Sequence, residues 1–113
     1  MFVIIAKYLI PNGYRGLTVF PFVFIKYAFD SENKVLINHE KIHIKQQMEL
    51  LVLPFFLWYF IEYGVRLLQY KNADLAYRNI SFEREAYANE INLDYLETRR
   101  FFSFLKYLKE NRK

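Results

Sequence analysis

His39 and His43 are the two histidines of this chain, and Glu40 directly follows the first of them. On an α-helix, residues four apart lie on the same face, so both imidazoles can reach one metal ion. Glu40 would lie about 100° further around the helix, near the open side of the ion, where a carboxylate can take a proton from water. The H-E-x-x-H spacing therefore predicts a zinc site with its own general base, and not two histidines placed by chance.

The third zinc ligand has to come from elsewhere in the chain. A catalytic zinc ion usually takes three protein ligands and leaves one position for water or substrate. The chain has no cysteine and no further histidine, so this ligand should be a carboxylate. The candidates are three aspartates and Glu49, Glu62, Glu83, Glu85 and Glu90. Glu49 is expected to point away from the histidines on their helix, and Glu62 can pair with Arg66 one turn later.

Glu83 and Glu85 stand at the start of a second predicted helix, in the segment FEREAYANE of residues 82–90. An acidic side chain in the first turn of a helix is stabilised by about 0.3–1 kcal/mol without any metal. The H-E-x-x-H motif supplies only two zinc ligands, however, and this favours one of the two glutamates as the third. The residues alone leave both open.

The segment HEKIH, followed further along the chain by EREAY, resembles the gluzincin metallopeptidases, which carry H-E-x-x-H on one helix and E-x-x-x-D on a following one. In that pattern the first glutamate binds zinc, and the aspartate one turn later hydrogen-bonds a ligand histidine. The small size and the H-E-x-x-H-x-x-Q-Q form, which ends at Gln46 and Gln47, are also similar to minimal gluzincin-like domains of bacterial hypothetical proteins. The resemblance covers residues 17–95.

Two alignments of the second motif imply different ligands. Against the E-x-E-A-D of membrane CAAX-type prenyl proteases, Glu83 is the ligand and Tyr87 takes the aspartate position. Against the E-x-x-C-D of membrane antibiotic-sensor proteases, Glu85 is the ligand and Asn89 takes that position. We prefer Glu83 because E-x-E-A is the closer match. The metal ligands predicted from the resemblance are thus His39, His43 and Glu83.

The function expected from these residues is zinc-dependent hydrolysis of a peptide bond in a peptide or protein substrate. Zn²⁺ would polarise a water molecule, and Glu40 would take its proton and return it to the leaving amine. One alternative is a non-catalytic zinc-binding domain, which has no use for Glu40. Another is a membrane-associated helical scaffold or interaction protein without metal, which the amphipathic segment of residues 99–113 would suit.

The elements that must position these residues form an α-rich α+β domain of zincin-like minimal type over residues 1–113. Residues 17–29 are rich in β-branched and aromatic side chains and predict an edge strand or β-ribbon, and the part from Phe20 to Tyr27 would bind an extended substrate. A helix over residues 32–53 would carry the histidines. One long helix would begin with Ser81 as its N-cap and bury a stripe made of Tyr87, Ile91, Tyr95, Phe102 and Leu105.

The apolar run of residues 51–61 is shorter than the roughly 20 residues that cross a bilayer. A buried core helix is the first interpretation, and an interfacial membrane segment or a crossing that includes Glu62 and Arg66 are the alternatives. With 12 Phe and 10 Tyr in 113 residues, the aromatic content suits a compact core, a lipid interface or both.

The amino-acid composition excludes several classes of partner and of catalytic chemistry. The net charge of +4 comes from mixed charges instead of a basic block, so no nucleic-acid partner is expected. Without cysteine there is no disulfide framework and no thiol nucleophile. The apolar N-terminal segment is interrupted by Lys7 and lacks a cleavage site, so we expect no signal peptide and a cytoplasmic or membrane-associated location.

Overall fold

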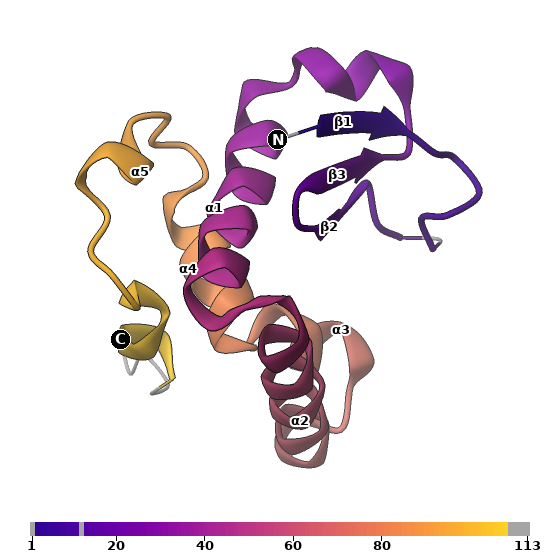
Figure 1. Cartoon of the computed structure of the whole chain (residues 1–113). Coiled ribbons are helices and arrows are strands. Elements are labelled where there is room, and N and C mark those ends of the chain that lie inside the picture. The colour runs from indigo at the N-terminus through magenta and orange to yellow at the C-terminus, as the bar shows by residue number, and fades with distance from the viewer. Residues whose placement is uncertain (1, 12, 109–113) are drawn as a thin grey trace.

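The computed structural model describes residues 2–11 and 13–108 and shows an α+β fold that is mostly helical, with an N-terminal three-stranded sheet followed by helices (Figure 1). This agrees with the predicted fold class. The described elements, in chain order, are β1 (Phe2–Ile5), β2 (Gly16–Val19), β3 (Phe22–Ile25), η1 (Ala28–Glu32), α1 (Lys34–Leu50), α2 (Val52–Tyr70), α3 (Ala73–Arg78), α4 (Ser81–Asn89), α5 (Tyr95–Thr98) and η2 (Ser103–Tyr107).

The sheet has the strand order β1-β3-β2, so β3 is its central strand. β3 pairs in parallel with β1 and antiparallel with β2, and Val23 lies opposite both Val3 and Thr18. The prediction that residues 20–27 form a free edge for substrate is therefore wrong, because the strand in that segment, Phe22–Ile25, is the central one. One edge of the sheet is β2, which lies beside α1, and Val23 and Ile25 of β3 pack on Ile44 of the same helix.

α1 carries the H-E-x-x-H motif, as expected, but it is shorter than the predicted span of residues 32–53. Asn33 caps its N-terminus, where the side-chain oxygen accepts a hydrogen bond from the backbone N–H of Leu36 at 3.1 Å. At Leu51 the backbone takes a φ of 66°, which ends the helix, and α2 begins at the next residue. Pro54 thus lies in the first turn of α2, where its missing N–H costs no helical hydrogen bond.

α2 is not the buried core helix that we expected. Only Phe55, Glu62 and Arg66 are fully buried along its length. Phe55 belongs to an aromatic core that consists of Phe55, Ile80, Phe82 and Phe104. Glu62 and Arg66 form the predicted ion pair at 3.1 Å. Among the described residues, no single helix is long and apolar enough to cross a bilayer, although α1 and α2, bent by 111°, meet that length and composition together.

The single long helix predicted from Ser81 onward is broken after α4. The side-chain amide of Asn38 donates to the backbone carbonyls of Asn89, Glu90 and Asn92 at 3.3, 2.9 and 2.9 Å. These contacts stabilise a turn at the end of α4, so the predicted stripe does not form, and Ile91 is 78% exposed.

Ser81 is also not the N-cap of α4, a position that Ile80 holds. The carboxylate of Glu62 instead accepts hydrogen bonds from the backbone N–H of Ser81 at 2.7 Å and from its hydroxyl at 2.6 Å. A carboxylate at a helix N-terminus satisfies free N–H groups and complements the helix dipole. Glu62 thereby joins α2 to the start of α4.

Candidate metal centre

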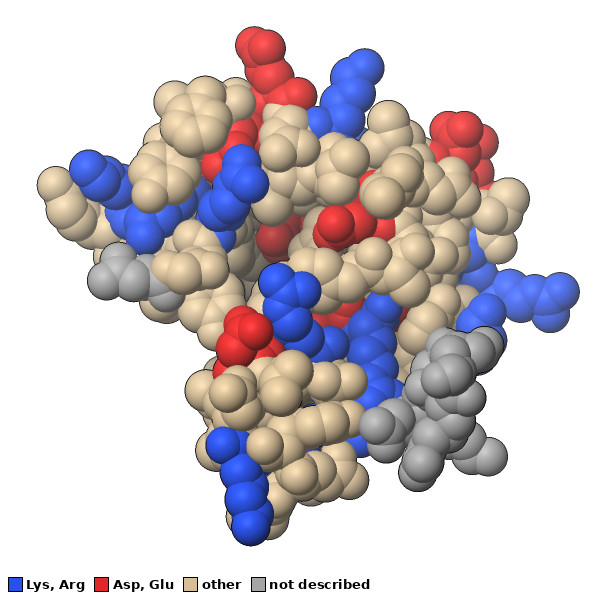
Figure 2. Space-filling model, turned by 180° about the vertical axis from the view of Figure 1, so that it is seen from behind, with Lys and Arg blue, Asp and Glu red and all other residues tan. Residues whose placement is uncertain are grey.

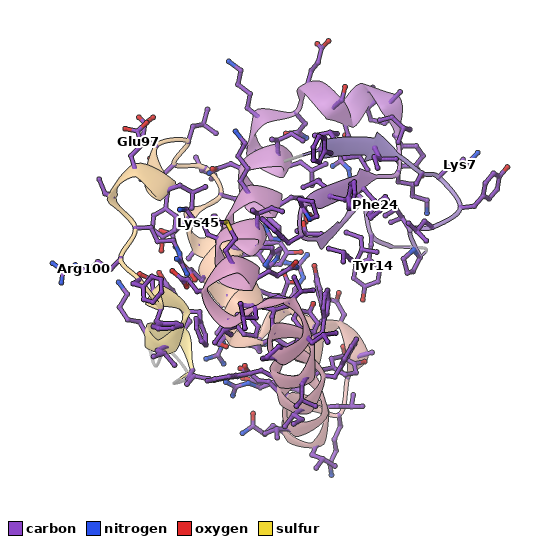
Figure 3. The ribbon with its side chains drawn as sticks, in the orientation of Figure 1. Lys7, Tyr14, Phe24, Lys45, Glu97 and Arg100 are labelled. Carbon is purple, nitrogen blue, oxygen red and sulfur yellow. The ribbon has the colours of Figure 1, made fainter. Side chains whose placement is uncertain are left out.

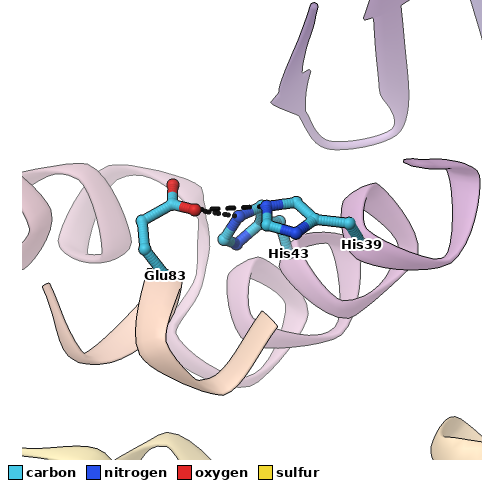
Figure 4. Close-up of side chains that lie close together, drawn as sticks. All are labelled: His39, His43 and Glu83. Carbon is cyan, nitrogen blue, oxygen red and sulfur yellow. Dashed lines mark hydrogen bonds and ion pairs between the residues drawn. The ribbon is translucent and has the colours of Figure 1, made fainter. Parts of the chain in front are cut away.

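His39, His43 and Glu83 come together between α1 and α4 (Figure 4). The two imidazole rings stand edge to face with their centroids 4.9 Å apart. Oε1 of Glu83 lies 3.2 Å from Nε2 of His39 and 3.1 Å from Nε2 of His43. All three residues are buried. Periodicity placed the histidines on one face of α1, and the packing of α4 brings the carboxylate to that face.

These three side chains fit a zinc ion in type and spacing. Each offers one ligand atom, and the three atoms lie within 4.8 Å of one another. A tetrahedral ion with bonds of about 2.0–2.1 Å would separate its ligand atoms by roughly 3.3 Å. The two distances from Oε1 of Glu83 are close to that separation, and imidazole nitrogen with carboxylate oxygen is a usual zinc ligand set.

The outer nitrogen of each histidine is held by a hydrogen bond. Nδ1 of His39 donates to Oε1 of Glu90 at 2.7 Å, and Nδ1 of His43 donates to the amide oxygen of Gln46 at 2.7 Å. Because Nδ1 carries the donated hydrogen, Nε2 of each ring is the nitrogen available to a metal. Both contacts orient the rings towards the shared point.

Sequence reasoning did not assign either of these orienting roles. The resemblance put Tyr87 or Asn89 in the position that hydrogen-bonds a ligand histidine. Tyr87 instead packs its ring against His39, with centroids 4.6 Å apart, and the side chain of Asn89 donates to the backbone carbonyl of Glu85. Glu90, which directly follows α4, takes the orienting role. Gln46 could have been found from its i+3 spacing to His43 on the same helix.

Glu85, the alternative third ligand, lies in a different cluster. Its Oε1 accepts a hydrogen bond from Nε2 of Gln46 at 2.9 Å, and its Oε2 accepts one from the hydroxyl of Tyr95 at 2.6 Å. Arg99 bridges Glu85 and Glu49, and all three side chains in this bridge are at most 5% exposed. Glu49 thus points elsewhere, as expected. Glu85 holds Gln46 in place and does not face the histidines directly.

The second oxygen of Glu83 is also occupied by a protein contact. The hydroxyl of Tyr59, on α2, donates to Oε2 of Glu83 at 2.7 Å. The ring of Tyr59 is stacked on Phe82 with centroids 6.2 Å apart, which fixes the direction of this hydroxyl. Oε1 is therefore the oxygen left to face the histidines, and three helices contribute to the placement of this carboxylate.

Glu40 lies against strand β2 and borders a cavity next to the metal centre. The hydroxyl of Thr18 donates to Oε1 of Glu40 at 2.5 Å. The cavity has a volume of about 370 Å³, and Glu40, His43 and Glu83 all line it. Tyr14 contributes to the wall from the loop before β2 and points towards α3, where its ring packs edge to face on Tyr77 (Figure 3).

The electrostatics of the cluster follow from burial and close opposite charges. Burial alone would lower the pKa of His43, but the Glu83 carboxylate outweighs burial and raises this pKa to about 9. Burial alone would raise the pKa of Glu83, but the two histidines lower it well below its usual range. Burial and then Glu83 raise the pKa of the Tyr59 hydroxyl, which stays protonated as a donor. A metal ion must therefore displace a proton from His43.

Comparisons with protein-family models, curated proteins and solved structures found no match for this chain. The site is therefore characterised by its own geometry. Two imidazole nitrogens and one carboxylate oxygen converge on a single point, and a second carboxylate, Glu40, borders a cavity that His43 and Glu83 also line.

Proposed function

We propose that this protein is a small zinc-dependent peptidase with His39, His43 and Glu83 as metal ligands and Glu40 as general base. The observation that carries the proposal is the convergence of Nε2 of both histidines on Oε1 of Glu83, beside a cavity that His43, Glu83 and Glu40 line. A zinc site that only stabilises the fold has no need of a carboxylate beside its open side. Peptide hydrolysis requires one.

The residues divide the work of hydrolysis between them. Zn²⁺ held by these three side chains would polarise a substrate carbonyl and lower the pKa of a water molecule towards neutrality. Glu40 accepts the proton of the attacking water and delivers it to the nitrogen of the leaving amine, so the carboxylate is regenerated. Thr18 holds one oxygen of Glu40 and leaves the other for this proton transfer.

The outer edge of β2 is the part of the sheet suited to bind an extended peptide beside this site. Gln47 covers one end of that edge, because its amide donates to the carbonyl of Thr18 at 2.8 Å and accepts from the backbone N–H of Phe20 at 2.6 Å. Gly16, at the other end, lines the cavity. A substrate backbone that pairs with Gly16 would pass Glu40.

The test is the metal content of protein purified without a histidine tag, by elemental analysis, together with hydrolysis of a mixed pool of quenched fluorescent peptides. We expect about one zinc per chain. His43→Ala and Glu83→Gln should lose it, and Glu97→Gln, a change on the exposed surface, should keep it. Circular dichroism checks that each variant folds.

Glu40→Gln separates catalysis from metal binding. We expect this variant to retain zinc and to lose hydrolysis, because the amide cannot accept the proton. Hydrolysis that persists in Glu40→Gln would exclude the proposed mechanism. Zinc in the wild type without any hydrolysis of the peptide pool would favour the non-catalytic zinc domain.

A further inference from the structure

The outward side of α2 is apolar along its full length. We call this side the outer face of α2, and it consists of Leu53, Leu57, Phe60, Ile61, Val65 and Leu68, each at least 48% exposed. Their spacing of three and four residues places them on one side of the helix. The two charged residues of α2, Glu62 and Arg66, are instead buried and paired. A helix at a water-exposed surface carries its charged residues on the exposed side and its apolar residues on the buried side. On α2 this arrangement is reversed.

We propose that the outer face of α2 docks on a lipid bilayer. Protein interfaces concentrate Tyr, Trp, Phe, Arg and Met at their centres, with Leu and Val under-represented among the residues that carry the binding energy. On α2 the residues Trp58, Tyr59 and Tyr63 pack inwards on the aromatic core, and the outer face consists of Leu, Ile and Val with a single Phe. The composition of the outer face thus fits hydrocarbon better than a protein surface.

Charge complementarity supports an anionic lipid surface. On α1, Lys34, Lys41 and Lys45 are exposed at a spacing that puts them on one side of that helix. Met48, which is also exposed, lies one turn beyond Lys45 on the same side of α1. Leu51 is exposed as well and lies between this side of α1 and the start of α2. A row of lysines that leads into an apolar helix face is the arrangement by which peripheral proteins bind anionic membranes. The lower end of the molecule, where α2 and α3 lie, also presents mostly uncharged atoms when seen from behind (Figure 2).

The outer face is continuous with the cavity of the metal centre. Phe60 is 64% exposed on that face and also lines the cavity, together with half-buried Phe56. Docking would therefore bring the mouth of the cavity to the bilayer surface. Resting on the proposed function, this position gives the substrate class: an apolar peptide segment presented at a membrane surface.

The experiment measures binding of the purified protein to vesicles of phosphatidylcholine alone and of phosphatidylcholine with phosphatidylserine, by flotation. Trp58, the one tryptophan of the chain, lies on α2 and reports contact through quenching by brominated lipid. The test variant is Leu57→Glu with Ile61→Glu. The matched control is Ile91→Glu, because Ile91 is a similarly exposed isoleucine outside α2.

We expect the wild type and Ile91→Glu to float with the vesicles and to bind the mixture containing phosphatidylserine more tightly. The double variant should bind roughly a hundredfold more weakly or worse, since it loses two apolar side chains that docking would bury in the bilayer. A double variant that binds like the wild type overturns the proposal. A wild type that does not bind vesicles also overturns the proposal. This holds if analytical ultracentrifugation shows a monomer, and it holds equally if it shows a dimer that the double variant does not form.

The same samples distinguish failure of the docking proposal from failure of the proposed function. Zinc content and hydrolysis of a soluble peptide are measured without lipid, and we expect the double variant to retain both. Vesicle binding by a wild type that holds no zinc would refute the peptidase and leave the docking surface standing. Full peptidase activity without vesicle binding would refute the docking surface and leave the proposed peptidase function standing.

Discussion

Replacement of Gly16 by alanine should disable Glu40 without disturbing the metal ligands. A Cβ at position 16 would lie 2.7 Å from Oε2 of Glu40 and 3.1 Å from its Cδ, whereas ordinary contacts of a Cβ begin at 3.4 Å. The carboxylate must therefore move by about 0.7 Å (3.4 minus 2.7), and its hydrogen bond from Thr18 must change with it. The backbone at Gly16 does not have a positive φ, so alanine fits the strand itself.

The expected size of the effect follows from that displacement. Misplacement of a catalytic group by about 1 Å can cost around a hundredfold in rate, so we expect kcat/KM to fall by roughly ten- to a hundredfold. Zinc content should not change, because no ligand atom is among the atoms that a Cβ at Gly16 would meet first. The free energy of unfolding should change by less than about 1 kcal/mol, since the entropic gain of Gly→Ala offsets a weakened hydrogen bond.

Three measurements on Gly16→Ala test this reasoning: peptide hydrolysis, zinc content and urea unfolding. Gly64→Ala, on α2, is the matched control, because a Cβ there meets nothing within 4 Å. It should leave hydrolysis unchanged and add up to about 1 kcal/mol of stability. Full activity in Gly16→Ala would refute the assigned position of Glu40, and loss of zinc would show that the substitution disturbs the ligands as well.

The other predictions concern the groups that support the site. Arg99→Met should destabilise the fold by about 3–5 kcal/mol in urea unfolding, because it leaves the buried carboxylates of Glu49 and Glu85 without their counterion; a loss below about 1 kcal/mol would contradict this. Tyr59→Phe removes a hydrogen bond to a ligand carboxylate and should raise the dissociation constant of zinc by about tenfold or more in a chelator competition, with no loss of fold; an unchanged constant would show that this hydroxyl does not support the ligand. In metal-free protein with chelator, the raised pKa of His43 means that its stabilising contribution is complete below pH 6.5 and is lost as pH rises to about 9. The urea midpoint should fall over that range, and His43→Ala should lack that fall.

Local patterns were enough to predict the fold class and the face that carries the histidines. The spacing of His39 and His43 on any helix puts both imidazoles on one side, whatever surrounds that helix. The predicted start of this helix, at residue 32, lies two residues before its observed start at Lys34. The ion pair of Glu62 with Arg66 followed from the same periodicity. Each of these inferences depends on contacts within a single element.

Tertiary structure decided everything that depends on how the elements meet. Glu83 and Glu85 are two residues apart on α4, roughly 200° around the helix, so only the packing of α4 on α1 determines which one faces the histidines. The end of α4 depends on Asn38, whose amide binds carbonyls more than fifty positions away in the chain. The sequence alone determined the residues that share a face, because helical periodicity is local. Which faces pack together is a long-range property, and only the folded chain determined it.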